Sequence, residues 1–273
     1  MLPSDVEALV AAIASDLDSG ASELTVRALE AFEALLPVDP SAKAVEELAA
    51  KLAAAQPNMA SVRNVAQLCA RLVARSSNPP AAFREIRREL SGAHERIARN
   101  AIEVIAGKPT VVTISRSLAV TAILKSLQSR RRLTQVFILE SLPGREGRRT
   151  AAEFAAAGIP SKLVADDLAQ SLVRRSDVVL TGADTVLLDG TLVNKVGTHD
   201  LALACEAWDK PFYAACEALK IDSLRTAQTF PPPDPASPEA EVVFDLTPAQ
   251  FIRSFITDKG VFEPKDIARV WLL

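Results

Sequence analysis

The chain has 273 residues, 49% of them hydrophobic, and is therefore long enough for a main domain with a packed core and a second, smaller domain. Its 34 acidic and 31 basic residues give a formal net charge of -3. This balance excludes the broad basic field through which proteins bind nucleic-acid phosphates, so no nucleic-acid partner is expected.

The cysteines and the apolar runs indicate the cellular compartment in which the protein is expected. Cys69, Cys205 and Cys216 are an odd number without clustered spacing, which argues against a disulfide framework and against a structural zinc site. The first residues lack the pattern of a signal peptide, and no apolar run approaches the roughly 20 residues that span a bilayer. We expect a cytoplasmic protein without a metal ion and without a membrane partner.

The first part of the chain, from Ser4 to about Ala106, has helical periodicity. Apolar residues recur every three to four positions, as in Val6-Leu9-Val10-Ile13, and the proline-containing turns at Asp39-Pro40 and Asn78-Pro79-Pro80 interrupt the pattern. Several antiparallel helices satisfy it. We therefore predict a small all-helical domain over residues 1–106, in which the charged stretch around His94 faces water.

The pattern changes after Lys108-Pro109. Short β-branched or aliphatic runs, each followed by a helical segment, predict strands at Thr110 to Ile114, Gln135 to Leu139, Ser161 to Ala165, Val178 to Thr181 and Pro211 to Ala215. This alternation is typical of a parallel sheet with helices on both faces. The predicted fold class is thus α/β, with a Rossmann-like, doubly wound, mainly parallel sheet over residues 107–273.

Two further segments are distinctive. Thr185 to Leu188 and Thr191 to Val193 flank an Asp-Gly turn and predict a hairpin. The proline-dense stretch at residues 231–235 predicts an extended surface connector. No G-x-G-x-x-G follows the first strand, so a dinucleotide site is disfavoured and no cofactor is expected.

The most informative run is residues 182–198. Asp184 follows an apolar strand, Asn194-Lys195 follows the hairpin turn, and Gly197-Thr198 begins a helix. The backbone N–H groups of that helix start, the Lys195 cation and the Asn194 amide would suit a small phosphorylated anion, with Asp184 as acid or base. The alternative is an ordinary hairpin and helix entry that bind nothing.

Other polar residues follow the remaining predicted strands. Ligands of open α/β sheets bind outside the carboxyl ends of the strands, where loops and helix starts converge. The residues expected there are Ser115, Arg116, Ser117, Glu140, Ser141, Asp184, Cys216, Glu217 and Lys220.

These motifs resemble a known family. Residues 182–198, the stretch from Glu140 to Arg148, Gly158-Ile159-Pro160, and Phe244 to Pro248 are similar, in the same order, to signatures of the family that unites the α, β and δ subunits of initiation factor 2B with the isomerases of methylthioribose-1-phosphate and ribose-1,5-bisphosphate. The resemblance runs from about residue 105 to the end. It implies a Rossmann-like sugar-phosphate-binding domain and a homodimer or higher homo-oligomer.

The resemblance also implies roles for single residues. Asp184 matches the isomerases' acid/base aspartate, whereas Ser115 stands where they have a catalytic cysteine. Gln56 and Leu142 stand where the family has arginines. The implied substrate-binding residues are Ser117, Arg116, Glu140, Asn194, Lys195 and Lys220.

Three hypotheses follow. The first is a protein that binds a sugar phosphate or nucleotide monophosphate in the cleft between its domains, without cysteine-dependent isomerase chemistry. The second is an aldose-ketose isomerase of a phosphorylated pentose, with Asp184 as acid/base and Ser115 or a water molecule in the cysteine's role. The third is a scaffold of a translation complex that takes no such ligand.

Overall fold

The structure is a computed structural model that describes residues 2–16, 19–76, 78–230 and 243–272. The predicted proline-rich connector at residues 231–235 lies outside the described residues. The chain forms two compact units, Met1–Ala93 and His94–Leu273, so the division falls inside a helix, α5. The predicted helical domain, residues 1–106, thus includes the end of α5, which packs in the second unit.

The first unit is helical, as the periodicity predicts. Its helices are α1 (Ser4–Ser15), α2 (Ala21–Leu35), α3 (Ala42–Ala55), α4 (Ala60–Arg75) and the first part of α5 (Pro79–Val104). Their apolar faces are buried, and the Phe32 and Phe83 rings meet edge to face with centroids 6.2 Å apart. The Gln56 amide donates hydrogen bonds to the carbonyls of Ile13 and Asp16 and so holds the end of α1.

The second unit is built on a seven-stranded sheet in the order β11-β10-β7-β4-β1-β2-β3. All neighbouring strands are parallel except β10 and β11, which are antiparallel. The strands are β1 (Thr110–Thr113), β2 (Gln135–Leu139), β3 (Ser161–Val164), β4 (Val178–Thr181), β7 (Phe212–Cys216), β10 (Ser254–Thr257) and β11 (Gly260–Phe262). The Rossmann-like, mainly parallel sheet is confirmed, with each of the five predicted strands present.

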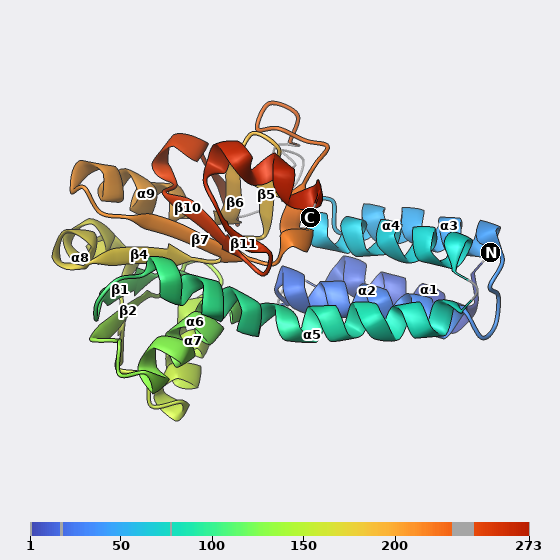
Figure 1. The fold of residues 1–273 in the computed structure, drawn as a ribbon, viewed down its shortest axis with the longest axis horizontal. Coiled ribbons are helices and arrows are strands. Elements are labelled where there is room, and N and C mark those ends of the chain that lie inside the picture. The colour runs from blue at the N-terminus through green and yellow to red at the C-terminus, as the bar shows by residue number, and fades with distance from the viewer. Residues whose placement is uncertain (1, 17–18, 77, 231–242, 273) are drawn as a thin grey trace. The chain divides into compact units, whose positions relative to one another are not determined.

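Helices cover both faces of this sheet (Figure 1). Successive strand residues point to opposite faces: Val111 packs in the same buried cluster as the end of α5, α6 (Leu118–Ser129) and α7 (Glu146–Ala156). The next residue, Val112, packs with α8 (Ala169–Arg175) and α9 (Thr198–Ala207). Such burial on both faces explains why β4 and β7, the strands buried throughout, are apolar almost along their whole length rather than alternating.

A smaller sheet has the strand order β8-β5-β6-β9. The predicted hairpin is confirmed, because β5 (Thr185–Leu187) pairs antiparallel with β6 (Leu192–Lys195). The strands β8 (Ile221–Asp222) and β9 (Phe244–Thr247), like β10 and β11, were not expected from sequence. Short 3₁₀ helices complete the fold: η1 (Asp166–Leu168), η2 (Ala218–Lys220), η3 (Ala249–Phe251) and η4 (Pro264–Leu272).

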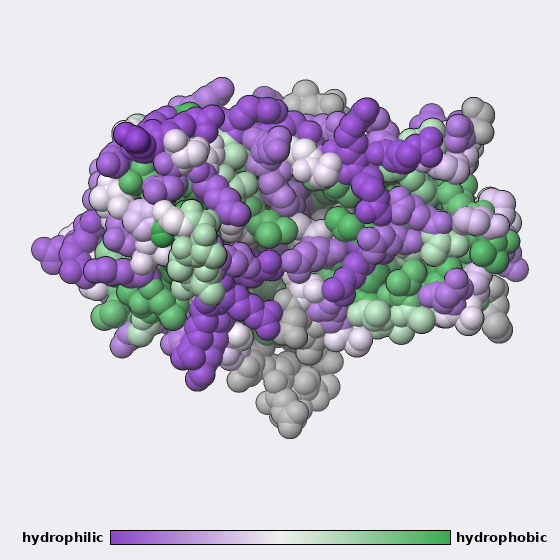
Figure 2. Space-filling view, turned by 90° about the horizontal axis from the view of Figure 1, so that it is seen from below, coloured by the Kyte–Doolittle hydropathy of each residue, from purple (hydrophilic) through white to green (hydrophobic). Residues whose placement is uncertain are grey.

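Polar residues dominate one face of the molecule. Figure 2 shows hydrophilic residues over much of the visible face, with hydrophobic residues in separate patches between them. Among the described residues, no helix is both long and apolar enough to cross a membrane.

Candidate functional site

Three predicted residues come together beyond the carboxyl ends of the strands. Asp184 lies between β4 and β5, where its backbone N–H donates to the Val193 carbonyl at 3.0 Å. Lys195 ends β6, and Lys220 ends η2 directly after β7. Both lysines act electrostatically on the Asp184 carboxylate, so side chains from three segments share one site.

Asp184 has unusual electrostatics. Burial raises the pKa of its carboxyl to about 6, against the pull of Lys220 and Lys195 and with help from the Glu146 and Glu217 carboxylates. Within the described part of the chain, the Asp184 side chain has no hydrogen-bond or ion-pair partner. A carboxyl group with such a pKa can exchange a proton near neutral pH, and its oxygens are available to a ligand.

Lys220 is held by a second carboxylate. Its Nζ atom lies 3.2 Å from Glu217 Oε2, and Glu217 Oε1 lies 2.8 Å from His94 Nε2. Burial lowers the pKa of Lys220, but Glu217 and Asp184 outweigh it, so that the pKa is raised and the ammonium stays charged. The expectation that His94 faces water is wrong, because α5 presents its ring to Glu217.

Lys195 is paired as well. Its Nζ atom donates to Glu146 Oε1 at 2.9 Å, and the Lys195 side chain is almost fully buried. Glu146 is the first residue of α7, which starts close beneath the end of β2. Sequence reasoning missed Glu146, because nothing in the Gly-Arg-Glu-Gly stretch distinguishes it from an exposed loop acid.

Ser117 and Asn194 converge on Gly182, the residue that follows β4. Ser117 caps α6, accepting a hydrogen bond from the Val120 N–H. A Cβ atom at Gly182 would lie 2.7 Å from Ser117 Oγ and 3.9 Å from Asn194 Oδ1. The Asn194 amide donates to Thr198 Oγ1 at 2.9 Å, which fixes its orientation.

Ser115 occupies a tight loop after β1. Its φ of 63° is in the left-handed region, and its backbone N–H donates to Ser141 Oγ at 2.7 Å. The thiol of Cys216, at the end of β7, is buried, and this burial raises its pKa to about 12. Cys216 therefore does not supply a thiolate in place of the missing cysteine.

Arg116 and Glu140 are engaged in ion pairs on α7. Arg116 Nε lies 2.7 Å from Glu153 Oε1, and Glu140 Oε1 lies 2.6 Å from Arg148 Nη2. Neither is among the charges that act most on Asp184. The structure thus gathers Asp184, Asn194, Lys195, Lys220 and Ser117, while the charges of Arg116 and Glu140 are satisfied by α7 residues.

The start of α9 differs from expectation. We expected its backbone N–H groups to receive a phosphate, but the Gly197 and His199 N–H groups donate to Asp245 Oδ2 at 2.8 and 3.0 Å. Burial raises the pKa of Asp245 to about 6, although these bonds lower it. The expectation is wrong because β9 brings a carboxylate of the chain itself to the helix N-terminus.

Replacing Asp245 by alanine is expected to lower the free energy of unfolding by about 1–2 kcal/mol, because two N–H groups at the start of α9 lose their acceptor. Asp245→Asn keeps a neutral acceptor and is expected to be at least as stable as the wild type at pH 7.5. Thermal unfolding followed by circular dichroism compares the three proteins. Equal destabilisation by both substitutions would contradict this role.

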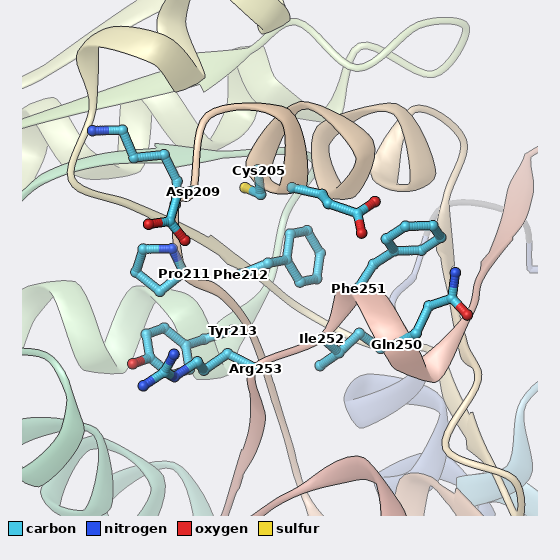
Figure 3. A pocket seen from close by; sticks show the side chains of 11 residues that line it. Cys205, Asp209, Pro211, Phe212, Tyr213, Gln250, Phe251, Ile252 and Arg253 are labelled. Atoms are coloured by element: carbon cyan, nitrogen blue, oxygen red, sulfur yellow. The ribbon is translucent and has the colours of Figure 1, made fainter.

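A hollow of about 470 Å³ lies elsewhere, at the amino end of β7. Figure 3 shows Phe212 of β7 on the side of Phe251, while Tyr213 points the other way and lies beside Arg253. Glu217 and Lys220 follow the opposite end of β7, so this hollow is separate from the Asp184 site. The described residues also hold no group of His, Cys, Asp and Glu side chains arranged to bind a metal ion.

Comparisons with known proteins agree with the fold. The profile of the Initiation factor 2 subunit family matches residues 6–264. A putative translation initiation factor eIF-2B subunit 2-like protein of Pyrococcus abyssi is 33% identical over 276 residues, which is 98% of this chain and all of the relative. The crystal structure of the Pyrococcus horikoshii translation initiation factor eIF-2B superposes with a TM-score of 0.87 at 29% identity, covering 97% of this chain and all of that one.

Isomerases are also similar, over a shorter stretch. The methylthioribose-1-phosphate isomerase of Thermosynechococcus vestitus is 35% identical over 158 residues. This match covers 50% of the chain and 44% of the isomerase.

Proposed function

The chain belongs to the Initiation factor 2 subunit family, and we propose that it binds a small phosphorylated ligand, a sugar phosphate or a nucleotide monophosphate, beyond the carboxyl ends of its parallel strands. One observation carries this proposal: the Asp184 carboxylate has no partner within the described residues and lies in the field of two buried lysines, Lys195 and Lys220. The Asp184 side chain is partly exposed, so its oxygens are accessible, and a ligand would supply the donors that they lack.

The proposal is for binding without cysteine-dependent isomerase chemistry. An aldose-ketose isomerisation needs one group that accepts a proton and a second that donates one. Ser115 offers only an alcohol, and the buried Cys216 thiol has a pKa of about 12. Asp184, by contrast, has a pKa of about 6, which suits proton transfer near pH 7.

That same pKa favours the second candidate, an isomerase of a phosphorylated pentose. Asp184 would act as acid and base, with Ser115 or a water molecule in the other role. The similarity to methylthioribose-1-phosphate isomerase supports this candidate over the half of the chain that it covers.

One experiment separates the candidates. The purified protein is incubated with ribose-1,5-bisphosphate or methylthioribose-1-phosphate, while NMR follows conversion and calorimetry follows the unfolding temperature. We expect that the ligand stabilises the protein and is not converted. A ligand at a hundred times its Kd adds about 2.7 kcal/mol to the free energy of unfolding. Conversion that Asp184→Asn abolishes would establish the isomerase instead. Neither conversion nor stabilisation by any phosphorylated sugar or nucleotide would favour the scaffold.

Assembly and compartment complete the proposal. We propose a homodimer or higher homo-oligomer, which the exposure of Leu203 and Trp208 near the end of α9 supports. The cysteines are free thiols, which suits the cytoplasm.

A further inference from the structure

The Lys195–Glu146 ion pair places a carboxylate of the chain on a lysine that an incoming anion would use. The Nζ and Oε1 atoms are 2.9 Å apart, and the side chain of Lys195 is only 4% exposed. Removal from water strengthens the attraction between the two groups. The positive charge of Lys195 is therefore already neutralised before any ligand arrives.

The charges around the Lys195–Glu146 pair also disfavour an anion at Lys195. The carboxylates of Asp184, Glu146 and Glu217 surround two ammonium groups, those of Lys195 and Lys220. Three negative groups exceed two positive ones, and Lys220 is itself paired with Glu217. A phosphate dianion at Lys195 would meet this surplus of negative charge.

The pair still has hydrogen-bonding capacity for neutral groups. Glu146 Oε2 is buried and has no hydrogen-bond partner in the described chain. An ammonium has three N–H donors, and Glu146 is the partner that the described residues provide for Lys195. A hydroxyl group can donate to Glu146 Oε2 and accept from Lys195 at the same time, whereas a phosphate-ester dianion has no O–H group with which to donate.

Gly144 makes room for this carboxylate. A Cβ atom at residue 144 would lie 2.5 Å from Glu146 Oε1, the oxygen that accepts from Lys195. The observed pairing therefore requires a residue without a side chain at this position. A methyl group there would push the flexible end of Glu146 away from Lys195 without changing any charge.

We propose that Glu146 is a specificity-determining residue, which keeps phosphate from Lys195 and directs hydroxyl groups of the sugar to the Lys195–Glu146 pair. This inference rests on the proposed function. It assigns the sugar's hydroxyl groups, rather than its phosphate, to this part of the site.

The test uses inorganic phosphate as the probe, titrated calorimetrically into the full chain. Glu146→Gln keeps an acceptor for Lys195 but removes the competing charge, and we expect phosphate to bind about tenfold more tightly than to the wild type. The matched control, Glu206→Gln, removes the same charge from an exposed position on α9 that, within the described chain, makes no contact with the site. It is expected to leave phosphate binding at the wild-type level.

Gly144→Ala supplies a second, independent test, because it displaces Glu146 without removing it. We expect phosphate binding that is tighter than in the wild type and weaker than in Glu146→Gln. If phosphate binding is not tightened in Glu146→Gln, including the case in which neither protein binds it, the inference is wrong. If wild type and Glu146→Gln both fail to bind every sugar phosphate while only the variant takes up phosphate, the proposed function fails, and with it the assignment of sugar hydroxyl groups to this pair; only the exclusion of phosphate from Lys195 by Glu146 stands.

Discussion

Replacing Gly147 by alanine is expected to lower the free energy of unfolding by about 3–5 kcal/mol and to leave most of the protein unfolded or aggregated. Gly147 is the second residue of α7, and a Cβ atom there would lie 1.9 Å from the carbonyl oxygen of Leu139. The clash is with backbone at the end of a central strand, which cannot rotate away as a side chain could. α7 would have to move off β2, and Glu146 with it.

The measurement is the yield of soluble protein and its unfolding temperature. Gly158→Asn is the control, because a Cβ atom at Gly158 would meet nothing within 4 Å and asparagine tolerates its φ of +65°. We expect Gly158→Asn to fold like the wild type. A Gly147→Ala protein that unfolds at the wild-type temperature would show that α7 does not approach β2 as closely as described.

Replacing Asp184 by asparagine is expected to stabilise the protein at pH 7.5. The pKa of Asp184 in the folded chain is about 6, above its ordinary value of 3.8. The folded state therefore holds this proton more tightly than the unfolded state. The stabilisation of the folded state by this proton is complete below pH 3.8 and is lost as the pH rises through 6. At neutral pH the ionised carboxylate therefore lowers the free energy of unfolding by about 1–3 kcal/mol relative to a neutral group.

The increase in the free energy of unfolding that Asp184→Asn brings should accordingly shrink as the pH falls from 7.5 to 4. Chemical denaturation at several pH values measures it, with Asp167→Asn as a control in which an exposed acid is replaced. A gain that does not change with pH, or a loss of stability at pH 7.5, would contradict the raised pKa. Stability gained at the expense of ligand binding is the pattern expected of a functional residue.

Much of the fold could be predicted from the sequence. The five predicted strands alternate with helical segments along the chain, and the Asp189-Gly190 turn fixes the β5–β6 hairpin. β10 and β11 escaped prediction, although β10 is as long as the predicted strands β1, β3 and β4. Their strand character comes from pairing with β7 and with each other, which local sequence does not encode.

The candidate site was predictable in part, because some of its residues follow elements that the sequence reveals. Asp184, Lys195 and Lys220 each follow a recognisable element, and the carboxyl ends of parallel strands bring such residues together. Their partners were not predictable. Glu146 is 49 residues from Lys195 in sequence, and Asp245 is 48 from Gly197, so only the folded chain shows that the lysine and the helix start are already occupied.

The central claim is that Asp184, Lys195 and Lys220 serve one ligand. Calorimetric titration of the chain with a panel of phosphorylated sugars and nucleotides tests it most directly. We predict that one member binds, that Lys220→Met abolishes this binding, and that replacement of the exposed Lys125 by methionine leaves it unchanged. Absence of binding by the whole panel, or undiminished binding to Lys220→Met, would contradict the claim.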